Sequence, residues 1–172
     1  MNKGIDSRPL LLVDVDGVLA PFGGDGAPSP DHRHDGGHWW AHDLNGERLR
    51  RLARRFELVW CTGWEHLAND LVGPPHGLPQ LPVIVFGPAL EGPAPLTWKL
   101  PGVRSFVGGR AVAWLDDMLF GDAYAWAAAR SAPTLLWRTR PDVGVTTEAV
   151  RALEAFAARV AAGDPEAGAR AA

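Results

Sequence analysis

An apolar run that ends in two aspartates constrains the fold of this chain most: Leu10–Val13 leads directly into Asp14-Val15-Asp16-Gly17. A short run that is apolar at consecutive positions is typical of a strand buried on both faces, as in a parallel sheet covered by helices. Residues i and i+2 of a strand project to the same side, so Asp14 and Asp16 are expected to lie together at the strand's carboxyl end. Ligands of parallel sheets bind at that edge. The alternative interpretation is an ordinary strand that runs into an Asp-Gly turn.

Short apolar runs alternate with helical patterns along the rest of the chain. The predicted strands are Leu10–Val15, Glu57–Cys61, Val83–Phe86, Ala111–Leu115 and Thr134–Trp137. Helices are predicted on the apolar stripe Leu44, Leu49, Leu52 and Phe56, over Glu65–Val72, from Trp98 or Lys99, over Asp122–Arg130, and from a cap at Thr146 or Thr147 to about Ala162. This alternation predicts an α/β fold with a doubly wound, Rossmann-like, mainly parallel five-stranded sheet and helices on both faces.

The length of 172 residues indicates a single domain, which we expect over 1–162, followed by a flexible tail over 163–172. The segment 21–42 is rich in Gly, Pro, Asp and His and is predicted to form a long loop over the functional edge of the sheet. The spacing of its histidines, His32, His34 and His38, fits no standard zinc site, so a solvated loop is the favoured interpretation.

The composition is that of an ordinary globular chain without a strong charge bias. Apolar residues make up 47%, charged residues make up 22%, and the formal net charge is -3, which gives no global sign of binding to nucleic acid or to an anionic membrane. No apolar run approaches the roughly 20 residues that span a bilayer, and the first residues lack the apolar core of a signal peptide. The single cysteine, Cys61, rules out a disulfide framework. We therefore expect a cytoplasmic protein without membrane contact.

Polar side chains follow the predicted strands or begin a predicted helix at four points of the chain. They are Asp14 with Asp16, Thr62 with Gly63, Lys99, and Asp116 with Asp117. In a parallel sheet these points converge at one edge. The set fits phosphoryl transfer, because one carboxylate can attack phosphorus, a second can transfer protons, and Mg²⁺ prefers oxygen ligands. A lysine and a hydroxyl can hold the phosphoryl oxygens.

In this order the residues resemble the four motifs of the haloacid dehalogenase (HAD) superfamily, over most of the chain from Leu10 to about Trp137. The resemblance implies that Asp14 is the nucleophile and that Asp16 is the general acid and base, with its backbone carbonyl as a metal ligand. It implies a phosphate-binding group of Thr62, Gly63 and Lys99, and a metal-binding group of Asp14, Asp16, Asp116 and Asp117. The expected cofactor is Mg²⁺, with Mn²⁺ as an alternative, since oxygen-rich sites accept both.

The residue Asp16 separates subclasses of that superfamily, because its dehalogenases lack an aspartate there whereas its phosphatases and phosphotransferases carry one. The runs Glu57–His66, Trp98-Lys99 and Trp114–Asp117 further resemble the HAD domains associated with "Swiss Army Knife" RNA-repair proteins. That resemblance implies a phosphatase that acts on RNA or other nucleic-acid ends. The intervals between the motifs are too short for a separate cap domain, so we expect a site that is open or covered only by the loop 21–42.

Three alternatives for the function stay open: a small-molecule phosphatase or nucleotidase, a phosphotransferase, and a non-catalytic binding module on the same scaffold. Each residue also has a purely structural interpretation. Asp116 and Asp117 could end a strand in a turn, Lys99 could be a surface lysine, and Thr62 could cap a helix. The tryptophans near the motifs, Trp60, Trp98 and Trp114, are more typical of a core, and Asp122 is expected to cap the helix that it begins.

Overall fold

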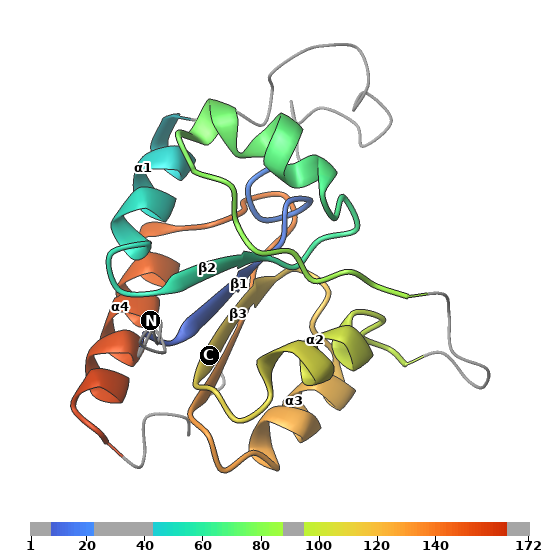
Figure 1. Ribbon diagram of the computed structural model, residues 1–172, viewed down its shortest axis with the longest axis vertical. Helices are drawn as coiled ribbons and strands as arrows, with labels where there is room; N and C mark the ends of the chain where they lie inside the picture. Colours follow the sequence, from blue (N-terminus) through green and yellow to red (C-terminus); the bar gives the residue numbers. More distant parts are fainter. Residues whose placement is uncertain (1–7, 23–42, 88–94, 165–172) are drawn as a thin grey trace, which may run out of the picture.

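The computed structural model describes residues 8–22, 43–87 and 95–164. Its centre is a sheet of the strands β1 (Leu10–Val13), β2 (Glu57–Trp60), β3 (Val112–Asp116) and β4 (Thr134–Arg138). The spatial order is β2-β1-β3-β4, and every neighbouring pair is parallel (Figure 1). The predicted α/β class with a parallel sheet is therefore confirmed.

Helices cover both faces of the sheet (Figure 1). The helices α1 (Asp43–Leu52) and α4 (Thr147–Ala161) pack on one face, and α2 (Leu100–Val107) and α3 (Gly121–Ala128) pack on the other. Because successive side chains of a strand point to opposite faces, Leu11 and Val13 join the first cluster whereas Leu10 and Leu12 join the second. Burial on both faces explains why β1 is apolar at consecutive positions.

The fifth predicted strand, Val83–Phe86, is not confirmed in the described part of the chain. This segment forms one isolated bridge, between Val83 and Trp60 of β2. The N–H of Trp60 donates to the carbonyl of Pro82, and the N–H of Ile84 donates to the carbonyl of Trp60, both at 2.9 Å. Pro82 has no N–H with which to extend the ladder. The described sheet has four strands, and the doubly wound five-stranded arrangement stays a prediction.

Two helix starts agree with the sequence analysis. The hydroxyl of Thr146 accepts the N–H of Ala149 at 3.1 Å and caps α4. The helix α2 begins directly after Lys99, and Pro101 lies in its first turn. Backbone N–H groups there have no acceptor within the helix, so a proline costs no hydrogen bond.

Two other helical predictions are corrected. The segment Glu65–Val72 is not one α-helix but a turn followed by the π-helical segment η2 (Ala68–Val72), after which a 3-10 turn, η3, spans Pro74–His76. Glu65 has a φ of 46°, in the left-handed region, so a right-handed helix cannot begin there. Asp122 does not cap α3, because the N-cap position is occupied by Phe120.

The part of the predicted loop 21–42 that begins at residue 23 lies outside the described residues, and so does the tail from residue 165. The expectations for His32, His34 and His38 therefore stay predictions. Within the ranges that the structure describes, no helix combines the length and the apolar character that a membrane crossing requires.

A stacked pair of phenylalanines joins α4 to the segment that follows α1. The rings of Phe56 and Phe156 are buried, with centroids 6.4 Å apart and an interplanar angle of 6°. We predict that Phe156→Ala lowers the free energy of unfolding by about 3–5 kcal/mol, because it leaves a cavity beneath α4. Urea denaturation measures this, and Phe106→Ala, at an exposed phenylalanine of α2, should cost less than about 1 kcal/mol. Equal losses would contradict the packing described here.

Candidate active site

The carboxyl ends of β1, β2 and β3 bring most of the predicted residues to one edge of the sheet. The N–H of Asp14 donates to the carbonyl of Leu115 at 3.1 Å, so Asp14 lies beside the end of β3. The N–H of Cys61 donates to the carbonyl of Val13 at 2.9 Å, which places Thr62 beside the end of β1. The parallel register thus accounts for the meeting of motifs that are far apart in the sequence.

A buried ammonium group joins two buried carboxylates at this edge. The Nζ atom of Lys99 lies 2.5 Å from Oδ2 of Asp14 and 2.8 Å from Oδ2 of Asp116. The exposed fractions of Lys99, Asp14 and Asp116 are 3%, 4% and 0%. Lys99 is therefore not a surface lysine. Because water and salt screen these buried charges little, the ammonium and the carboxylates must compensate one another.

Backbone and indole N–H groups hold the two carboxylates in place. Oδ1 of Asp14 accepts the N–H of Val15 at 2.7 Å. Oδ1 of Asp116 accepts the N–H of Met118 at 2.8 Å, and Oδ2 accepts the indole N–H of Trp114 at 3.1 Å. Trp114 is a core residue, as expected, but its hydrogen bond to the site is a role that sequence reasoning missed.

Asp117 adds a third carboxylate to this cluster. One oxygen of each of Asp14, Asp116 and Asp117 can be chosen so that all three atoms lie within 4.8 Å of one another. The donors are all hard oxygens, and three carboxylates against one ammonium leave an excess of negative charge. This donor set fits Mg²⁺, which is usually held by one or two carboxylates together with phosphate oxygens. The side chain of Asp16 is not part of the set, and the predicted role of its backbone carbonyl stays a prediction.

Burial and mutual repulsion perturb the titration of the cluster. Burial raises the pKa of Asp14 to about 7; the Lys99 ammonium lowers this pKa, and the charge of Asp116 raises it. Burial, followed by the charge of Asp116, raises the pKa of Asp117 as well. Burial lowers the pKa of Lys99, but Asp14 and Asp116 outweigh it and raise this pKa overall. The carboxylates therefore gain from an added cation, which favours their ionised form.

The remaining predicted residues surround the turn that follows β2. Oδ2 of Asp16 accepts the indole N–H of Trp64 at 3.0 Å. Thr62 is fully buried, and its hydroxyl accepts the backbone N–H of Trp64 at 3.4 Å, so it also stabilises this turn. Gly63 is exposed. Trp64 lies in the run Glu57–His66, but sequence reasoning gave it no role.

Trp98 corrects the expectation of a core tryptophan, because 41% of it is exposed. Its ring edge lies 3.8 Å from where a Cβ atom on Gly63 would stand, and its centroid lies 5.5 Å from the Nζ atom of Lys99. Phe86 packs against it edge to face at 4.8 Å. An exposed aromatic ring thus borders the predicted phosphate-binding residues.

Hydrogen bonds between Thr97 and Asp122 hold the segment that leads to Lys99. Sequence reasoning missed this contact too. The hydroxyl of Thr97 donates to Oδ1 of Asp122 at 2.6 Å and accepts the N–H of Phe120 at 3.0 Å. The backbone N–H of Thr97 donates to the same carboxylate. Asp122 therefore ties the start of α3 to the segment that carries Lys99 and does not belong to the carboxylate cluster.

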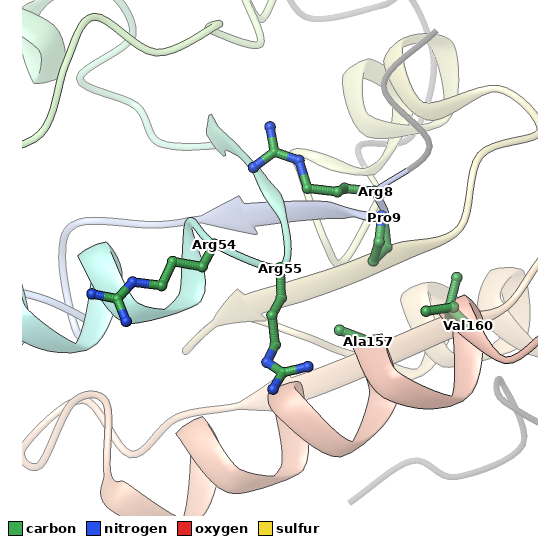
Figure 2. A pocket seen from close by; sticks show the side chains of 7 residues that line it. Arg8, Pro9, Arg54, Arg55, Ala157 and Val160 are labelled. Atoms are coloured by element: carbon green, nitrogen blue, oxygen red, sulfur yellow. The ribbon is translucent and has the colours of Figure 1, made fainter.

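A cavity of about 430 Å³ lies at the opposite edge of the sheet, below the amino ends of β1 and β2. Arg8, Arg54 and Arg55 line it, but their guanidinium groups point in different directions (Figure 2). The guanidinium of Arg8 donates to the carbonyl of Ala53 at 2.7 Å. Since the three groups do not converge, this cavity is not organised as an anion site.

The fold and the edge residues define an α/β protein with a buried acidic site at the carboxyl end of a parallel sheet. No protein-family model, curated protein or solved structure matches the chain. The resemblance to the HAD superfamily therefore rests only on the sequence motifs and their order.

Gly17 leaves the space that Asp117 occupies. Its φ is 70°, and a Cβ atom there would stand 2.6 Å from Cγ of Asp117. We predict that Gly17→Ala displaces this carboxylate and weakens the binding of Mg²⁺ or Mn²⁺ at least about tenfold, because a charged ligand is misplaced. Isothermal titration calorimetry measures the affinity.

The matched control is Gly163→Ala, since its φ of 71° is close to that of Gly17 and a Cβ atom there meets nothing within 4 Å. It should bind the cation like the wild type. Unchanged affinity in Gly17→Ala would contradict a metal role for Asp117.

Proposed function

We propose that the protein is a Mg²⁺-dependent, HAD-type phosphatase that hydrolyses a phosphomonoester through an aspartyl-phosphate on Asp14. The observation that supports this most directly is the buried Lys99 ammonium between Asp14 and Asp116, with Asp117 in the same oxygen cluster. The proposal includes two features of the fold: the sheet is doubly wound and Rossmann-like, and the domain carries no separate cap domain.

The chain's own residues divide the work in this proposal. Asp14 attacks phosphorus; a bond forms between its carboxylate oxygen and phosphorus while the bond to the leaving oxygen breaks. Asp16 gives that oxygen a proton and later takes one from the water that hydrolyses the acyl phosphate. Lys99, Thr62 and the backbone of Gly63 hold the phosphoryl oxygens. Asp14, Asp116, Asp117 and the carbonyl of Asp16 would hold Mg²⁺, which would supply positive charge to offset that of the phosphoryl group.

Phosphorylated ends of RNA or other nucleic acids are the proposed substrates. The resemblance to RNA-repair domains suggests this class, and the exposed ring of Trp98 beside Gly63 supports it. Stacking of a base on an aromatic side chain contributes about 1–3 kcal/mol. A small-molecule phosphatase, a phosphotransferase and a binding module remain the competing proposals.

We predict that Asp14→Asn lowers kcat for p-nitrophenyl phosphate at least about 1000-fold, because an amide oxygen is a poor nucleophile. Circular dichroism should show an unchanged fold. Asp142→Asn, at a surface aspartate paired with Arg140, is the matched control and should keep wild-type activity. Retained turnover in Asp14→Asn would exclude the aspartyl-phosphate mechanism.

A substrate panel tests the metal and the substrate class. With Mg²⁺, we expect kcat/KM for 5′- or 3′-phosphorylated oligonucleotides to exceed that for mononucleotides at least about tenfold, and EDTA should abolish both activities. The reverse order would favour a nucleotidase. Transfer of the phosphoryl group to an added alcohol would indicate a phosphotransferase, and metal binding without turnover would indicate a binding module.

A further inference from the structure

Trp64 connects the loops that follow β1 and β2. Its indole N–H donates to Oδ2 of Asp16 at 3.0 Å, and its backbone N–H donates to the hydroxyl of Thr62 at 3.4 Å. One residue therefore contacts both the proposed acid–base group and the proposed phosphate-binding turn.

The indole ring of Trp64 is held by packing rather than left at the surface. It is half-buried and packs against the apolar cluster that lies between the sheet and the helices α1 and α4. Its apolar body thus anchors in the core while its polar N–H reaches the site, which suits a tryptophan.

The residue that follows Trp64 has an unfavourable backbone conformation. Glu65 has a φ of 46°, which is unfavourable for a residue with a side chain. Its carboxylate accepts the N–H of Phe86 at 2.8 Å. Strain of this kind persists only where surrounding contacts impose it, and such residues cluster at functional sites.

We propose that Trp64 is a positioning residue that orients the carboxyl group of Asp16 for proton transfer to the leaving oxygen; this inference rests on the proposed phosphatase function. A general acid has to lie within hydrogen-bond reach of the oxygen that it protonates, so the rotation of its carboxyl group matters. An indole N–H donates but does not titrate near neutral pH. Trp64 therefore fixes the orientation of Asp16 without exchanging the proton.

The dependence of the rate on the leaving group tests this role. A poor leaving group such as an alkoxide needs the proton, whereas p-nitrophenolate leaves without much help. The ratio kcat/KM reports the steps up to loss of the leaving group and is insensitive to later hydrolysis of the acyl phosphate. We expect Trp64→Phe to lower kcat/KM for an alkyl phosphate at least about tenfold more than for p-nitrophenyl phosphate.

Two comparisons make the test specific. Trp137→Phe makes the same change in a half-buried tryptophan of β4. It should leave kcat/KM unchanged for both the alkyl phosphate and p-nitrophenyl phosphate. In an Asp16→Asn background, Trp64→Phe should change kcat/KM for the alkyl phosphate less than about twofold, because the group that it positions has lost its function.

Each outcome is decisive. Equal losses for both leaving groups, no loss at all, or full additivity with Asp16→Asn would overturn the positioning role, while wild-type turnover would still support the proposed function. A wild-type protein inactive on every phosphomonoester would instead refute the proposed function, and the positioning role would fall with it.

Discussion

The ammonium group of Lys99, buried between Asp14 and Asp116, is the interaction on which the rest of the structure depends. A buried charge is stable only with close partners, and removal of one partner from a buried pair costs about 3–5 kcal/mol. The two carboxylates lie at the ends of adjacent parallel strands, and Lys99 precedes α2 on one face of the sheet. The charges are therefore compensated only when β1, β3 and α2 are correctly assembled, so the fold and the site form together. Lys3 is the chain's other lysine, and every other side chain with a permanent positive charge is an arginine.

The same cluster is incompletely neutralised. Asp117 adds a third carboxylate, and one ammonium cannot balance three carboxylates in their ionised forms, which is one reason why the pKa of Asp14 is raised, by burial above all, to about 7. A chain optimised only for stability would fill such a position with apolar side chains. An excess of carboxylates over ammonium groups in a buried cluster is a local conflict of the kind expected at functional sites. In the proposed phosphatase a bound cation would resolve this conflict, whereas a purely structural role offers no counterpart to the excess carboxylate.

Much of this arrangement could be predicted because it follows from the strand pattern. Consecutive apolar residues identified the four strands, and the parallel order placed Asp14, Asp116 and Asp117 at one edge. Val83–Phe86 is not confirmed as a strand, since it forms a single bridge and Pro82 has no N–H with which to extend the pairing. The interrupted helix after β2 could not be anticipated, since the conformation of Glu65 accompanies a tertiary contact with Phe86. The contacts Trp64–Asp16 and Thr97–Asp122 join residues 48 and 25 positions apart, and no local pattern announces such pairs.

Two tryptophans next to the turn after β2 differ in their burial and in what they contact. Trp64 is half-buried and directs its N–H to Asp16, whereas Trp98 is 41% exposed and borders Gly63. In the proposed phosphatase, Trp64 orients the carboxyl group that gives the leaving oxygen its proton, and Trp98 faces the part of the substrate beyond that oxygen. Because Trp64 packs into the core and Trp98 packs on Phe86, both rings are fixed before a substrate arrives. Preorganisation of this kind reduces the entropy lost on binding. Discrimination between substrates and the efficiency of proton transfer therefore depend on different side chains and can be altered separately.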